Sequence, residues 1–447
     1  MGSEKQYIDL YNECRTMICS HSDEVMNSVR DKAFEEFKRQ GFPTKKVERY
    51  KYTDVPALFS PNYGLNLNRL EIPVNPYDVF KCDVPNMSTL LYFVVNDMFY
   101  NKALPKGHLP EGVIVDSLNR VAAENPSFIG KYYAKLAKIE EDGITALNTM
   151  LAQDGLVVYI PKNVKMEQTL QVINIQRADV DFMSNRRVLI VVEEGAEAKL
   201  LFCDHAVDDR NFLATQVIEA FVGDNAQLDL YCLEETHIKN VRFSNLYIDQ
   251  KANSRVSHNA VTLHNGVTRN RTDLTFDGEG AECNMYGCVI ADKDQHVDNN
   301  MLIDHKTGHC TSNVLYKYVL DDKSTGAFAG RVLVRQDSQK TVSKETNHNL
   351  CATKEARMYT QPMLEIYADD VKCSHGSTVG QLNDAALFYM RQRGISLDEA
   401  KFLLQFAFAA EVIDQIKVEP LRDRLHHLLE KRFRGELNKC EGCKLCK

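Results

Sequence analysis

The sequence predicts a mainly β protein with a β-solenoid core between two α-helical regions. Segments rich in β-branched and aromatic residues alternate with period two through the middle of the chain. Apolar residues recur at three- and four-residue steps near both ends. Small residues precede the central strands at a loose repeat, as expected where the coils of a solenoid turn their corners. A β-sandwich is the alternative, although its strands recur at intervals of about 8–12 residues.

Residues 1–60 are predicted to form an N-terminal helical region, and residues 61–150 an irregular α/β connecting region. One apolar helical stripe is formed by Met26, Val29, Ala33 and Phe37. Gly41 and Pro43 should end that helix, because glycine permits the turn and proline cannot continue it.

Residues 151–375 are predicted to form the solenoid core. Each of four turns there places a small residue before a strand, and the central residues are Ala196, Ala226, Ala252 and Ala281. Successive gaps of 30, 26 and 29 residues fit one coil per repeat.

Residues 376–436 are predicted to be helical again, followed by a cysteine-containing tail at 437–447. Ser396 and Glu399 form a capping box, which satisfies free amide donors at a helix start. Residues 400–413 are apolar nearly all round and should be buried in the fold or against a partner. Pro420 opens a last helix with one apolar face, made of Leu421, Leu425, Leu428, Leu429 and Phe433.

The bulk composition excludes several classes of protein. A net charge of −8 argues against binding to nucleic acid or an anionic membrane, since both need a basic surface. We expect no export signal and no membrane span, and therefore a cytoplasmic protein. The thirteen cysteines are then expected to be reduced thiols rather than a disulfide framework.

Enzyme signatures are missing from the sequence. It contains no phosphate-binding loop of the GxxxxGK[ST] type, no GxSxG elbow and no HExxH zinc motif. A carbohydrate-cleaving β-helix enzyme would use carboxylates on one face, but such enzymes are exported. We therefore expect a protein that is not an enzyme.

Cys373 and His375 are the first candidate ligands. In an extended chain, residues two apart point to the same side, so a thiolate and an imidazole could share a soft metal. They could also form a nucleophilic Cys–His pair. The commonest role for a lone pair of this spacing is a buried cysteine beside a hydrogen-bonded histidine.

The tail carries the second candidate set, Cys440, Cys443 and Cys446. Their spacing resembles the start of a ferredoxin ligand run, but the fourth cysteine and its proline are absent. The tail could capture zinc, iron or sulfur, or be an oxidisable end.

Dense motifs follow one another between residues 273 and 396. They occupy residues 277–282, 295–299, 304–305, 312–313, 330–335, 338–341, 347–350, 361–376, 378–382, 387–389 and 393–396. In this order they closely resemble the SufB/SufD family of iron–sulfur cluster assembly proteins. Residues 373–376 and 420–422, with the N-terminal motifs at 41–44 and 50–53, resemble the SufD branch of that family.

This resemblance implies a right-handed parallel β-helix in a non-catalytic scaffold subunit that pairs with SufB and binds the ATPase SufC through its C-terminal helices. It places His375 at the SufB interface, where the nascent cluster forms, with Cys373 beside it. A cluster or iron would then be held in the complex, and nothing tightly by the isolated chain. Phe388, Tyr389 and Arg393 are the expected SufC-facing residues, unless their rings belong to the core.

Two further outcomes stay open at this stage. Alone, the chain could form a homodimer, because a surface built for a related subunit is self-complementary. It could also be an independent metal-binding or thiol-transfer protein that uses Cys373, His375 and the tail without partners.

Overall fold

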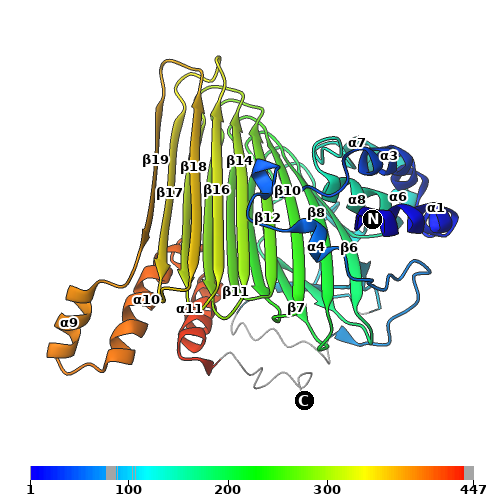
Figure 1. Cartoon of the computed structure of the whole chain (residues 1–447). Coiled ribbons are helices and arrows are strands. Elements are labelled where there is room, and N and C mark those ends of the chain that lie inside the picture. Colours follow the sequence, from blue (N-terminus) through cyan, green and yellow to red (C-terminus); the bar gives the residue numbers. More distant parts are fainter. Residues whose placement is uncertain (1, 77–86, 88, 103, 106, 437–447) are drawn as a thin grey trace.

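The computed structural model describes residues 2–76, 87, 89–102, 104–105 and 107–436. Two long sheets face each other (Figure 1). The first sheet joins the odd-numbered strands to a short hairpin, in the order β19 (Lys372–Gly380), β17 (Val342–Cys351), β15 (Thr311–Leu320), β13 (Glu282–Ala291), β11 (Arg255–His264), β9 (Gln227–Glu235), β7 (Glu197–Ala206), β5 (Thr169–Gln176), β1 (Thr89–Val95) and β2 (Met98–Phe99).

The second sheet consists of even-numbered strands with β3 at one edge. Its order is β18 (Arg357–Ile366), β16 (Thr325–Val334), β14 (His296–His305), β12 (Val267–Phe276), β10 (Asn240–Gln250), β8 (Phe212–Val222), β6 (Phe182–Val192), β4 (Leu156–Ile160) and β3 (Ile114–Ser117).

Consecutive strands alternate between the two sheets, so each coil contributes one strand to each sheet. Strand β14, for example, pairs in parallel with β12 and β16 without a register shift. Strands β4 to β19 make a parallel solenoid of about eight coils. The predicted solenoid is confirmed, because the sheets of a sandwich would pair their strands antiparallel.

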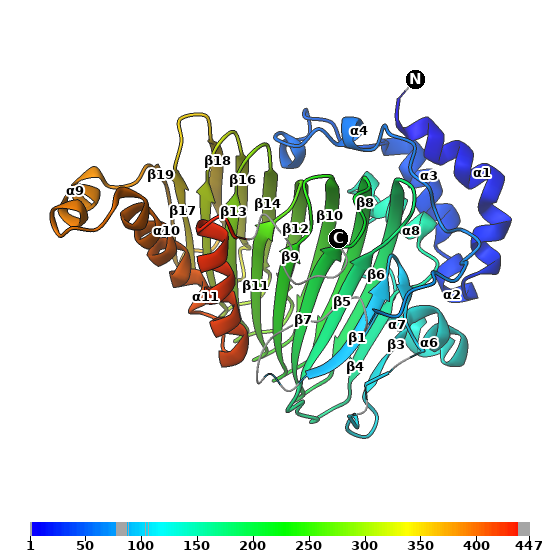
Figure 2. The ribbon, with the colours of Figure 1, turned by 90° about the horizontal axis from the view of Figure 1, so that it is seen from below.

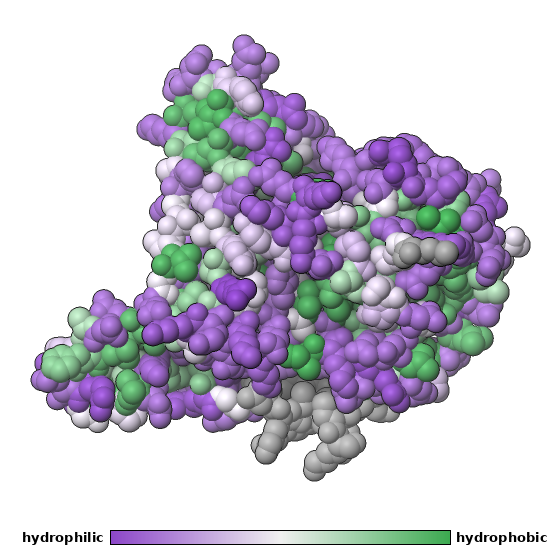
Figure 3. Space-filling view, viewed as in Figure 1, coloured by the Kyte–Doolittle hydropathy of each residue, from purple (hydrophilic) through white to green (hydrophobic). Residues whose placement is uncertain are grey.

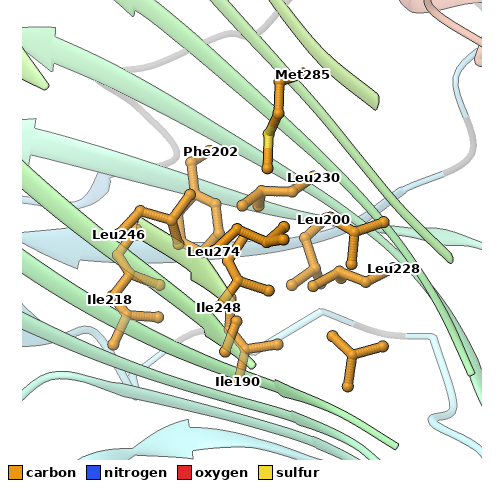
Figure 4. Packing of buried hydrophobic residues seen from close by; sticks show 14 of the residues in the cluster. Ile190, Leu200, Phe202, Ile218, Leu228, Leu230, Leu246, Ile248, Leu274 and Met285 are labelled. Carbon is orange, nitrogen blue, oxygen red and sulfur yellow. The ribbon is translucent and has the colours of Figure 1, made fainter. Parts of the chain in front are cut away.

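The interior between the two sheets is mostly apolar. Figure 4 shows side chains from both sheets meeting there, among them Ile190 and Ile218 from one sheet and Leu200 and Leu228 from the other. Alternate residues of each strand enter this core, as the period-two pattern predicts. In-register pairing stacks equivalent inward residues of successive coils in columns along the solenoid.

The corners after the even-numbered strands explain the repeat in the sequence. A residue with positive φ, such as Gly195, Asn225 or Asn253, is followed by a small buried residue. Ala196, Ala226 and Ala281 occupy that buried position, as predicted. At the remaining corner Ser254 is fully buried and Ala252 is not, so the prediction of Ala252 was two residues out of register. Serine fits there because its hydroxyl donates to the carbonyl of Lys251 at 2.6 Å.

The N-terminal helices cover the outer face of the even-numbered sheet at its first coils (Figure 2). They are α1 (Glu4–Ser20), α2 (Glu24–Asn27), α3 (Arg30–Gln40), α6 (Leu118–Glu124), α7 (Pro126–Tyr132) and α8 (Gly143–Leu151). The predicted apolar stripe is divided between α2 and α3 rather than lying on one helix, while Gly41 ends α3 with positive φ as predicted. The break lets Arg30 turn inward, where it donates to the carbonyl of Met150 at 3.0 Å.

Residues 44–54, which we call the strap, run over the outer face of the same sheet (Figure 1). The strap contains η1 (Glu48–Tyr50) and is followed by α4 (Val55–Leu58). Arg49 bonds Asp273 of β12 at 2.6 Å, and Thr53 donates to Asp298 of β14 at 2.7 Å. The strap therefore holds strands that follow it by more than 200 residues in the sequence.

The predicted boundaries of the core need correction at both ends. Strand β1 pairs in parallel with β5 and β3 pairs antiparallel with β4, so both sheets begin before residue 151. Strand β19 continues to Gly380, and the next helix begins at Asp384. The predicted boundary at residue 375 fell inside a strand because the glycines and serines of β19 carry little strand signal.

The C-terminal helices α10 (Leu397–Ile413) and α11 (Glu419–Phe433) pack on the outer face of the odd-numbered sheet (Figure 2). Leu421, Leu425, Leu428 and Leu429 are buried there, which confirms the predicted apolar face. Ser396 caps α10 by accepting from the amide of Glu399, but the Glu399 carboxylate bonds Arg434 instead of completing the capping box. Within the described residues, no helix is long and apolar enough to cross a membrane.

Candidate functional site

The last coil of the solenoid is formed by β18 and β19, which are the outermost strands of their sheets. Among the described residues, each pairs on one side only, β18 with β16 and β19 with β17. The other side of each strand presents unpaired backbone N–H and C=O groups, which form a template for pairing with another chain. The open end of the solenoid is therefore built like half of an interface.

Cys373 and His375 both lie on β19. They pair in register with Ser343 and Glu345 of β17, whose side chains are buried inside the solenoid. Because paired residues of a parallel sheet point to the same side, Cys373 and His375 face the interior of the last coil. Cys373 is half-buried, whereas His375 is exposed because no further coil covers it.

The thiol of Cys373 lies on a hydrogen-bonded column of polar side chains. Burial raises its pKa, and a hydrogen bond with the backbone of Ser343 offsets part of that rise. The hydroxyl of Ser343 lies 2.8 Å from that of Ser312, which in turn lies 3.0 Å from Nε2 of His305. A line of hydroxyl and imidazole groups thus leads from the open end toward the middle of the solenoid.

Glu345 lies on the same strand face, one coil below His375. It is only 1% exposed, and within the described residues neither carboxyl oxygen has a hydrogen-bond partner. This burial raises the pKa of its carboxyl to about 8. Glu345 is not part of any motif that the sequence pattern singles out. The signal that could have found it is the inward phase of β17, where a carboxyl is unexpected.

The described part of the chain contains no group of three or more His, Cys, Asp or Glu side chains placed to hold a metal ion. Cys373 and His375 offer one thiolate and one imidazole, which is fewer than the four ligands of a tetrahedral site. The other predicted ligands, Cys440, Cys443 and Cys446, lie outside the described residues.

Helix α9 (Asp384–Gln392) stands clear of the solenoid (Figure 1) and has no buried residue. Phe388 and Tyr389 are 65% and 59% exposed, so their rings are not core. Arg393 lies over the Tyr389 ring, 5.0 Å from its centroid, and donates to its hydroxyl at 2.8 Å. Figure 3 shows an apolar surface on this projecting helix and another at the end of the last coil that lies away from it. At the end of β18, Ile366 and the following Tyr367 are exposed.

These features define a parallel β-solenoid protein with an open last coil, which carries a thiol and an imidazole, and with a projecting helix close to it. Family models match almost all of the described chain. The SufBD protein N-terminal region matches residues 1–172, and the SufBD core domain of SUF-system FeS cluster assembly matches residues 174–408. The chain belongs to the SufBD family of iron–sulfur cluster assembly proteins.

Individual relatives agree with this assignment. The chain is 28% identical over 404 residues to the iron–sulfur cluster assembly protein SufD of Escherichia coli, covering 89% of this chain and 90% of that protein. It is 23% identical over 360 residues to SufD of Bacillus subtilis, covering 79% and 81%. A SufBD family protein of Synechocystis is 27% identical over 427 residues, 92% of each chain. The resemblance seen in the sequence is confirmed.

Proposed function

We propose that this chain is the SufD-type subunit of an iron–sulfur assembly scaffold, together with a SufB-like subunit and a SufC-like ATPase, and that it catalyses no reaction itself. The observation that carries the proposal is the open last coil, where unpaired β18 and β19 present Cys373 and His375. A SufB-like chain with a similar open coil pairs along these edges and supplies the remaining ligands.

The substrate of this shared site is iron or the nascent iron–sulfur cluster. A thiolate suits iron–sulfur chemistry, and an imidazole suits iron. Two ligands from one chain bind weakly, so the isolated subunit holds no cluster tightly. Retention of the cluster therefore depends on pairing of the two solenoids.

Helix α9 is the docking element for the SufC-like ATPase. Phe388, Tyr389 and Arg393 supply exposed aromatic area and a cation, the side-chain types that dominate binding hot spots. Residues 381–383 are the whole connection between α9 and β19. When ATP brings two SufC subunits together, movement of α9 passes through this short link to β19 and shifts the population of interface states.

The test of the shared site uses the chain co-expressed with its SufB-like and SufC-like partners. We expect His375→Ala to lower iron and sulfide per complex and to weaken the visible absorbance. Ser374→Ala is the matched control, because Ser374 lies between the two ligands and faces the other side of β19. Full iron, sulfide and absorbance in His375→Ala would refute the ligand role.

The test of SufC docking is capture of the ATPase by the intact chain. The double variant Phe388→Ala and Tyr389→Ala should reduce capture as strongly as a chain truncated before Gln381. Tyr367→Ala is the control, because Tyr367 is also 65% exposed but lies on the turn after β18. Undiminished capture by the truncated chain contradicts this assignment.

The open edges also allow two copies of the chain to pair. We propose a homodimer when the partners are absent, and light scattering of the isolated chain measures it. Stoichiometric iron or zinc in that isolated chain would instead favour an independent metal-binding protein.

A further inference from the structure

The floor of the last coil contains polar atoms that have no partner among the described residues. Both carboxyl oxygens of Glu345 and the hydroxyl of Thr360 on β18 are buried without a hydrogen bond. Leaving such groups unsatisfied destabilises the folded state, and a carboxylate more than a hydroxyl. The position of Glu345 could hold an apolar side chain, because the equivalent position one coil earlier is occupied by Val314 of the apolar core. The position of Glu345 therefore calls for a functional explanation.

The even-numbered sheet, opposite Glu345, leaves room for the Glu345 carboxyl at Gly330. A Cβ placed on Gly330 of β16 would lie 1.8 Å from Oε1 of Glu345. The carboxyl thus reaches across the coil and occupies the space that a side chain at Gly330 would take. The space at Gly330 therefore sets where the Glu345 carboxyl lies beneath the last coil.

His375 occupies the next position of the same column. Neighbouring strands lie about 4.8 Å apart, so the imidazole on β19 and the carboxyl on β17 are within reach of one another through rotation of the exposed histidine. Val314 and His375 lie before and after Glu345 in its column, and Gly330, which pairs with Pro362 of β18, faces its carboxyl from β16. Among these side chains, the imidazole is the one N–H donor available to it.

We propose that Glu345 is the positioning residue of His375, accepting the N–H of one imidazole nitrogen while the other nitrogen binds iron at the partner interface. Histidine ligands usually donate their second N–H to a carboxylate, a backbone carbonyl or water, which fixes the ring orientation. A neutral carboxyl can accept through its carbonyl oxygen, so the bond needs no change of charge. This inference rests on the proposed function of His375 and adds the group inside the chain that orients it.

The experiment measures iron retained by the co-expressed complex during competition with a chelator. Glu345→Met removes the acceptor at similar volume, and we expect at least about tenfold weaker retention, the usual effect of losing such a partner. Glu345→Gln keeps a carbonyl oxygen and should retain iron like the wild type. Thr360→Val, which removes a hydroxyl from the facing strand, is the control for a general change in the interior.

A second variant covers the case in which Glu345→Met fails to fold. Gly330→Ala displaces the carboxyl without removing it, and it should weaken iron retention in the same way. Full retention in either folded variant, or equal loss in Glu345→Gln and Glu345→Met, overturns the proposal. His375→Ala separates a failure of the proposed function from a failure of this inference. If His375→Ala retains all its iron, the proposed function is refuted. If His375→Ala loses iron while Glu345→Met retains it, the inference alone is refuted.

Discussion

Tyr52 of the strap stacks on Tyr359 of β18, with ring centroids 4.3 Å apart and an interplanar angle of 14°. Beside this pair, Gln361 of β18 donates to the carboxylate of Glu48 at 3.0 Å. The outermost strand of the even-numbered sheet is thus held from outside by a segment near the N-terminus, close to the open coil.

The two rings should stabilise each other measurably. Stacked aromatic pairs contribute about 0.5–1.5 kcal/mol beyond their buried area, and a double-mutant cycle with Tyr52→Ala and Tyr359→Ala isolates that coupling. We expect faster amide hydrogen exchange in β18 of each single variant. The double variant should exchange no faster than the single variants, because either substitution alone already removes the stacking contact. Independent, fully additive effects in urea unfolding would show that the rings are uncoupled.

Arg432 anchors α11 to the solenoid. It is buried and donates to the carbonyl of Leu263 at 2.7 Å and to Asp292 at 2.6 Å. Arg432→Ala should cost about 3–5 kcal/mol in free energy of unfolding, because it leaves these acceptors without their cation. Arg434→Ala breaks a solvent-exposed pair with Glu399, which water screens, and should lower the free energy of unfolding far less than Arg432→Ala. Equal losses in urea denaturation would contradict the anchoring role.

Acid should destabilise the isolated chain through histidines buried inside it. Burial lowers the pKa of His258 and of His305 from 6.5 to about 4. Between these values the unfolded chain binds more protons, so stability is present above pH 6.5 and is lost as the pH falls toward 4. Each histidine contributes up to about 3 kcal/mol. Replacing either by Gln should flatten the pH dependence of the melting temperature, and an unchanged pH dependence in both variants would contradict this prediction.

Glu345 should produce the opposite trend at higher pH. Burial raises its pKa to about 8, so the folded chain keeps a proton that the unfolded chain has released. Its stability contribution is therefore lost as the pH rises from 4.5 to 8, by about 2 kcal/mol between pH 6.5 and 8. With a chelator present to exclude metal, Glu345→Gln should lose less stability than the wild type over that interval. If the free energy of unfolding changes with pH equally in the two chains, the carboxyl is ionised in the folded protein and the prediction is wrong.

The solenoid could be predicted because its period and its corners are local properties of the chain. Gly195-Ala196 and Asn225-Ala226 show the turn directly, since a positive φ and a small buried residue leave a mark in composition. The interruption between α2 and α3 left no such mark, because Arg30 turns inward for a partner 120 residues away. Long-range hydrogen bonds decide details that periodicity does not carry.

The candidate site divides in the same way. Extended spacing correctly put Cys373 and His375 on one side of a strand, and their proposed role as ligands came from the family motifs around them. Glu345 could not be predicted from spacing or motifs, because its proposed role depends on its strand pairing with His375 and on the space at Gly330 across the coil. Those relationships exist only after the two sheets have formed.

The strap also has a consequence for how the protein is made on the ribosome. Arg49 emerges 224 residues before its partner Asp273, and Tyr52 even longer before Tyr359. The early coils can stack as they are synthesised, while the strap must wait for β12 to β18. Complete docking of the strap, with Tyr52 on Tyr359, therefore requires that translation has reached the last coil. We expect a chain truncated before β12 to keep a loose, protease-sensitive N-terminal segment.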